Sequence, residues 1–108
     1  MDQRVFDLLM NRGLTRGSVV QSLAGHDRLQ AYLVLKVEGC FVWLADGRSR
    51  QHECPKKKRI RHVRPLGVLT EPGLLDQIDS LGDAGQRDAA LRQLLNNFLA
   101  TNPLKEET

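Results

Sequence analysis

The sequence predicts a mainly β fold, a small β-barrel, with an α extension in the form of a C-terminal helical hairpin. Before residue 70 the apolar residues form short runs of strand length, separated by turn signals. After residue 70 they recur at helical spacing. The charge divides at the same place. Residues 1–69 carry 13 Lys and Arg against 6 Asp and Glu, whereas residues 70–108 carry 3 against 7.

These boundaries predict three segments: a short N-terminal extension over 1–14 that can form a helix, a basic barrel over 15–69, and an acidic helical extension over 70–108. A chain of 108 residues with 41% hydrophobic content suits one domain and excludes collagen-like, disulfide-dense and strongly disordered classes. No apolar run is long enough to span a bilayer, and the first residues lack the zones of a secretion signal. We therefore expect a cytoplasmic protein with no membrane partner, in which Cys40 and Cys54 are free thiols rather than a disulfide.

Five segments of the basic part are predicted to be strands: 17–22, 31–37, 40–45, 48–51 and 61–69. The dipeptides Glu38-Gly39 and Asp46-Gly47 are turn signals between β-rich runs, which favours an antiparallel meander. Pro65 confines the last strand to an edge or a bulge. Five strands this short cannot form two packed sheets, but they can curl into a barrel that hides most strand edges. The alternative is a flat three-stranded sheet covered by the later helices.

Two helices are predicted after residue 70. In the first, Thr70 is the expected cap, Pro72 suits the first turn, and Gly82 ends the segment. The second begins at Asp83 and stops at Asn102-Pro103. Each helix carries one apolar stripe, formed by Leu74, Leu75, Ile78 and Leu81 in the first and by Ala90, Leu91, Leu94, Leu95, Phe98 and Leu99 in the second. Neither helix is stable alone in water, so the stripes must pack on each other, on the barrel or on a partner. Residues 5–13 are predicted to form a short amphipathic turn.

The segment 55–65 is the strongest functional signal. It contains no acidic residue and carries His62 together with six cations, which are Lys56, Lys57, Lys58, Arg59, Arg61 and Arg64. Like charges so close together repel, and a polyanion such as a phosphate backbone relieves the repulsion and releases counterions. Ile60 and Val63 are expected to anchor the segment while the cations face outward. The alternatives are a solvated surface loop or a nuclear-import signal.

The order of motifs in the basic part resembles a known family. Residues 17–28 look like the start of a KOW motif, and the apolar runs 32–37 and 41–45, the Ala45-Asp46-Gly47 turn, Pro55-Lys56-Lys57-Lys58 and His62 follow in the family's order. This set resembles the small bacterial KOW-domain RNA-binding proteins, which are similar to archaeal and eukaryotic large-subunit ribosomal proteins. The resemblance covers about residues 15–69. It departs from the family at Leu29, where many relatives have a second glycine, and at Gln30, where they have a basic residue.

The resemblance implies an SH3-like barrel that contacts RNA through a glycine-centred loop and the basic segment. Carried over by position, Gly25 permits a close backbone approach, and His26 and Arg28 lie at the loop tip near RNA. Outside the motif, Arg48, Arg50 and His52 share one face if residues 48–52 are extended. They then either enlarge the basic surface or form an ordinary solvated strand edge.

Other site chemistries find little support in the sequence. Cys40, His52, Cys54 and His62 lack the paired spacing of zinc ligands, so we expect no metal site. No nucleophile stands beside a base, and no glycine-rich nucleotide loop is present, so we expect neither an enzyme nor a cofactor. Tyr32 and Trp43 have rings that can stack on bases, but each lies within an apolar run and is expected to fill the barrel or its rim.

These observations favour a non-catalytic RNA-binding protein that is associated with ribosomal RNA or the ribosome and serves translation. The alternative is a protein-interaction adaptor in translation or transcription, which uses the barrel and docks or self-associates through the C-terminal helices. DNA binding also stays open, because phosphate contacts do not distinguish the sugars.

Overall fold

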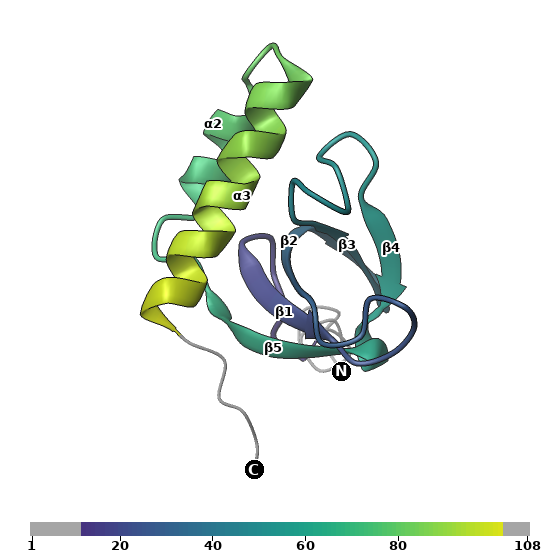
Figure 1. The fold of residues 1–108 in the computed structure, drawn as a ribbon. Helices are drawn as coiled ribbons and strands as arrows, with labels where there is room; N and C mark the ends of the chain where they lie inside the picture. The colour runs from purple at the N-terminus through teal and green to yellow at the C-terminus, as the bar shows by residue number, and fades with distance from the viewer. Residues whose placement is uncertain (1–11, 103–108) are drawn as a thin grey trace.

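The computed structural model describes residues 12–102, which form one five-stranded antiparallel sheet followed by two helices (Figure 1). The order of strands across the sheet is β4-β3-β2-β1-β5. A single 3-10 turn, η1 (Ile60–His62), joins the two outermost strands. The strands are β1 (Ser18–Ser22), β2 (Ala31–Glu38), β3 (Phe41–Ala45), β4 (Lys56–Arg59) and β5 (Val63–Val68).

The sheet is curled but open. In Figure 1 β4 lies at the right of a curved sheet and β5 along the bottom, and they are its two edges, since the described strands show no pairing between them. The predicted β architecture with a helical extension is therefore present, in the form of a strongly curved sheet. Pro65 lies on the edge strand β5, opposite Val20, next to a register shift between Val19 and Val20. The expectation for this proline is confirmed.

One predicted strand is wrong. Residues 48–51 are not extended, and the fourth strand is instead formed by the cations of 56–59. The Asp46 carboxylate accepts hydrogen bonds from the backbone N–H groups of Arg48 (2.9 Å) and Arg50 (2.8 Å), which folds this stretch back on itself. Asp46-Gly47 therefore opens a long loop, and the tight hairpin turn is the one between β2 and β3, at Gly39-Cys40.

The middle of the sheet is covered on both faces, whereas β3 and β4 leave part of the outer face exposed. Strand β1 is buried along its whole length, because neighbouring side chains point to opposite sides and both sides are covered. Val19 and Leu33 lie in a core with the helices, whereas Val20, Tyr32 and Val34 lie in a second core inside the curl of the sheet. Ile60 and Val63 belong to the second core, which confirms that they anchor the basic segment.

The helices are α2 (Gly73–Asp79) and α3 (Ala84–Thr101), which pack on each other and on the sheet. Helix α2 begins at Gly73 with Pro72 at the cap position, so Thr70 is not its cap. Asp83 stands at the cap position of α3, and α3 ends before Asn102, as predicted. Leu75, Leu91 and Leu95 fill the core against the sheet. Most of the predicted turn over 5–13 lies outside the described residues.

Polar contacts fix the helices to the basic part of the chain. Arg16 pairs with Asp76 (3.0 Å) and Asp79 (2.6 Å). His52 Nε2 lies 2.6 Å from Asp79 Oδ1, and the His52 backbone N–H donates to Asp88 (2.8 Å). Several of the acidic charges of the extension are therefore used to hold it against the sheet.

Candidate nucleic-acid interface

The basic segment forms strand β4 and the turn after it, and its cations point in two directions. Strand β4 pairs with β3 so that Lys57 lies opposite Trp43 and Arg59 lies opposite Phe41. These two cations are exposed, whereas Lys58, between them, is 8% exposed and points into the curl of the sheet. The prediction that all cations face outward is therefore wrong at Lys58, because side chains alternate along a strand.

Lys58 is held by a buried polar cluster. Its Nζ donates to Asp27 Oδ1 (2.8 Å), Ser22 Oγ (2.7 Å) and the Ala24 carbonyl (2.8 Å). The other Asp27 oxygen accepts from Lys56 Nζ (2.9 Å). Two of the four cations of β4 therefore share one carboxylate as their ion-pair partner.

The ionised form of Asp27 is strongly favoured. Burial opposes ionisation, but hydrogen bonds from Lys58, Lys56 and Ser22 outweigh it and hold the pKa of Asp27 far below its usual value. The cluster ties the loop 23–30 to β4, since Asp27 and Ala24 belong to the loop and Lys58 to the strand.

The backbone of the loop 23–30 is left-handed at its glycine. Gly25 has φ +86°, and a Cβ there would lie 3.4 Å from Asp27 Oδ1 and 3.9 Å from Lys58 Nζ. His26 and Arg28 are exposed on the same loop. Leu29 has φ +73° and is 60% exposed, which is unusual for a branched residue.

Two aromatic rings lie on the outer face of the sheet, among cations. Trp43 and Phe41 are half-buried, while Val42 between them faces inward. Lys36 Nζ lies 4.7 Å from the Trp43 ring centroid, Lys57 Nζ lies 4.3 Å from that of Phe41, and Arg59 Cζ lies 5.2 Å from it. We call these five residues (Lys36, Phe41, Trp43, Lys57 and Arg59) the outer platform. The expectation that Trp43 fills the barrel or its rim did not specify this outer face, although strand alternation in 41–45 could have indicated it.

A basic groove adjoins the outer platform. It has a volume of about 380 Å³ and is lined by Arg12, Cys40, Arg59, Ile60 and Arg61. Arg59 belongs to both the groove and the platform. Within residues 12–102 no carboxylate forms an ion pair with Lys57, Arg59 or Arg61, so their charge is available at the surface.

The remaining candidates lie apart from this groove. Arg64 follows on β5 and donates to Gln21 Oε1 (2.7 Å), and His62 is half-buried, with its carbonyl accepting from the Leu23 N–H (2.9 Å). Arg48 and Arg50 are exposed in the loop before β4, at the opposite end of that strand from η1. Because this loop is not a strand, Arg48 and Arg50 do not share a strand face with His52, which instead contacts the helices.

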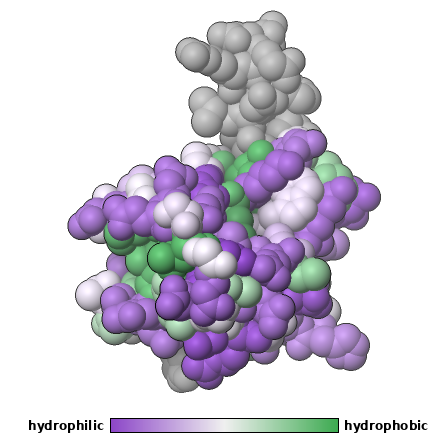
Figure 2. All heavy atoms as spheres, turned by 90° about the horizontal axis from the view of Figure 1, so that it is seen from above, coloured by the Kyte–Doolittle hydropathy of each residue, from purple (hydrophilic) through white to green (hydrophobic). Residues whose placement is uncertain are grey.

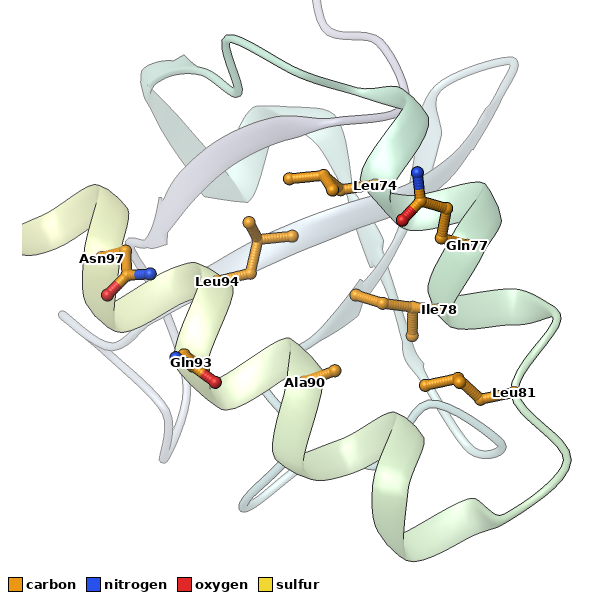
Figure 3. Close-up of a pocket in the computed structure, with 8 residues that line it drawn as sticks. All are labelled: Leu74, Gln77, Ile78, Leu81, Ala90, Gln93, Leu94 and Asn97. Carbon is orange, nitrogen blue, oxygen red and sulfur yellow. The ribbon is translucent and has the colours of Figure 1, made fainter.

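A second surface feature lies between the helices. An apolar groove of about 360 Å³ separates α2 from α3, and Figure 3 shows Leu74, Ile78, Ala90 and Leu94 directed toward the space between them. Gln77, Gln93 and Asn97 also line it. In Figure 2, hydrophobic residues gather on the side of the molecule where the helices lie, within a mostly hydrophilic face.

Comparison of the chain with known protein families and with curated proteins gives no match. Among residues 12–102, no three His, Cys, Asp or Glu side chains are grouped so that they could hold a metal ion. Cys40 and Cys54 are both free. In the same described part of the chain, neither helix has the length and apolar character that a membrane span requires.

Proposed function

We propose that this chain is a non-catalytic RNA-binding protein that is associated with ribosomal RNA or the ribosome. One observation carries the proposal: the exposed cations Lys57, Arg59 and Arg61, which have no carboxylate partner among residues 12–102, line one face and one groove. Such a surface neutralises a phosphate backbone and gains the entropy of counterion release. Selectivity then depends on RNA form rather than on base sequence, because phosphate contacts carry no sequence information.

The proposal includes the SH3-like barrel class and the KOW resemblance. Three features support it: the strand order with β1 between β2 and β5, the short turn η1 between the edge strands, and the left-handed Gly25 in the loop tied to β4. In this arrangement Asp27 and Lys58 fix the loop beside the cations. Loop and strand then form one rigid contact surface.

Salt-dependent RNA binding tests the proposal. We expect the double variant Arg59→Ala/Arg61→Ala to bind a structured ribosomal RNA fragment more weakly and with a shallower slope of log affinity on log salt, by about 0.7–0.9 for each lost phosphate contact. Arg48→Ala/Arg50→Ala is the matched control, since it removes the same charge from the other end of β4. Equal slopes for both variants would show that RNA binding depends on the net charge of the protein and not on contacts in the groove. Competition with duplex DNA at fixed salt separates RNA from DNA binding.

A second candidate function is favoured by the apolar groove between α2 and α3. A protein-interaction adaptor in translation or transcription would place an apolar segment of its partner between Ile78 and Leu94. Sedimentation of the whole chain with and without Leu94→Asn tests self-association through this groove. An unchanged monomer in both cases removes self-association from this alternative.

A further inference from the structure

We propose that the outer platform stacks the bases of unpaired nucleotides, so that single-stranded or looped RNA is the form this chain prefers. This inference rests on the proposed function and names the class of RNA. It concerns the faces of Phe41 and Trp43, whereas the proposed function depends on the phosphate contacts of the arginines.

The geometry of the outer platform carries the inference. Register places Lys36, Trp43 and Lys57 in one row across β2, β3 and β4, and Glu38, Phe41 and Arg59 in the next row. The two rings are therefore neighbours on one face, two residues apart along β3, with a cation beside each. Glu38 is the carboxylate on this face, and it pairs with Lys36 (2.9 Å).

The rings that would stack bases lie next to the cations that would bind phosphates. Arg59 lies over the Phe41 ring (5.2 Å) and also lines the basic groove with Arg12 and Arg61. A strand that stacks a base on Phe41 or Trp43 therefore has its backbone beside guanidinium groups. This combination of aromatic faces with a positively charged groove is the arrangement that binds single strands without sequence preference.

The cations that now contact the rings do not prevent stacking. An exposed cation–π contact is weaker than the stacking of a base on an aromatic side chain. A lysine displaced from the ring can also bind the phosphate that arrives with the base, so its charge stays matched. Replacing the cation–π contacts by base stacking and phosphate contacts is therefore favourable.

The bases of a duplex cannot use the platform. In an A-form helix the base faces are stacked on one another, so a protein surface alongside it meets phosphates, 2′-hydroxyls and base edges rather than base faces. A duplex would contact Arg59 and Arg61 but leave the rings of Phe41 and Trp43 without a base. A preference for unpaired RNA is the consequence that distinguishes stacking from phosphate contact alone.

Trp43 makes the test direct, because it is the sole tryptophan of the chain. Three probes are titrated against the whole protein: a single-stranded RNA of about ten nucleotides, its blunt duplex, and an abasic ribose-phosphate oligomer of the same length. We expect the single strand to quench Trp43 fluorescence and the abasic oligomer and the duplex to leave it nearly unchanged. We expect Phe41→Leu, which keeps Trp43 as the reporter, to weaken single-strand binding about five-fold or more while duplex binding stays the same.

Trp43→Leu is measured by anisotropy of labelled RNA and is expected to show the same selective loss. Val68→Ala, at an exposed apolar position on β5, is the control and is expected to bind all three probes as the wild type does. Base stacking would be overturned if the single strand and the duplex bound with equal, salt-dependent affinity and Trp43 fluorescence were not quenched. The proposed function would remain intact in that case. Absence of binding to either RNA would overturn both.

Discussion

Asp27 shows how one carboxylate organises the candidate interface. It is 8% exposed and joins the loop 23–30 to β4 through Lys58 and Lys56. The lysines of the basic segment therefore have different roles: Lys58 stabilises the fold, and Lys57 faces solvent. The sequence shows the charge but not this division, because Asp27 and Lys58 are 31 residues apart.

We expect Asp27→Asn to lower the free energy of unfolding by roughly 3 kcal/mol, because it leaves the buried Lys58 ammonium without its counter-charge. Chemical denaturation measures this loss. The double variant Asp27→Asn/Lys58→Met is expected to be more stable than the sum of the two single variants implies, since it removes both charges together. Additive losses would mean that the two side chains do not interact.

The same contact has a pH signature. Because the pKa of Asp27 is lowered on folding, its contribution to stability is complete above about pH 4 and is lost as the pH falls toward the folded-state value. The wild-type protein should therefore lose stability below about pH 4 more steeply than Asp27→Asn does. Parallel curves for the two proteins would contradict the assignment.

Leu29 carries backbone strain. Its φ of +73° lies in the left-handed region, where side chains with a Cβ are disfavoured by about 1 kcal/mol or more. We expect Leu29→Gly to raise the free energy of unfolding by about 1 kcal/mol, since the exposed side chain contributes little packing. Leu29→Ala keeps the strained backbone and is expected to give no gain in the same denaturation experiment. A gain of equal size in both variants would show that the side chain, and not the backbone, is the source.

At the scale of elements, the apolar runs were predictable and the charged strand was not. The runs 31–37 and 40–45 are rich in β-branched and aromatic residues, and they form β2 and β3 nearly as predicted. Lys56–Arg59 has poor strand propensity, and it is a strand because β3 offers it a pairing edge and the Asp27 carboxylate forms ion pairs with Lys56 and Lys58. Tertiary contacts decide such an element, and sequence periodicity does not report them.

The loop 46–55 takes its position from α3. Gly47 is buried with φ +74°, and a Cβ there would lie 2.1 Å from the Asp88 carbonyl oxygen. The Gly47 carbonyl accepts a hydrogen bond from Arg92 Nη1 (2.6 Å). The dipeptide that the sequence marks as a hairpin turn is therefore the place where the helix backbone approaches the sheet.

We expect Gly47→Ala to lower the free energy of unfolding by about 2–4 kcal/mol, since it combines backbone strain with a clash against the helix backbone. Gly39→Ala is the matched control, because Gly39 also has positive φ (+59°) but has no atom within 4 Å of the added Cβ. Thermal unfolding of the two variants separates the clash from the strain. A similar loss in both would show that α3 does not approach Gly47 so closely.

At the scale of the whole molecule, the division of charge along the sequence helps to hold the acidic helices against the basic sheet. Asp76, Asp79 and Asp88 of the extension contact Arg16 and His52 of the basic part. The outer platform and the basic groove, in contrast, involve none of residues 70–102, the described part of the extension. The acidic helices thus cover one face of the sheet and leave the cations of β4 and η1 uncovered.

This arrangement predicts that the helices are part of the fold rather than a separable appendage. A chain of residues 1–70 would expose Val19, Leu33 and Leu69, which are now at most 7% exposed. Burying each such side chain contributes about 1.5–3 kcal/mol, so their exposure removes an amount comparable to the ~5–15 kcal/mol that stabilises a domain. We expect residues 1–70 to unfold or associate, whereas the full chain stays folded. Circular dichroism melts and sedimentation compare the two proteins. A monomeric 1–70 chain of undiminished stability would mean that the helices do not support the sheet and are available to a protein partner.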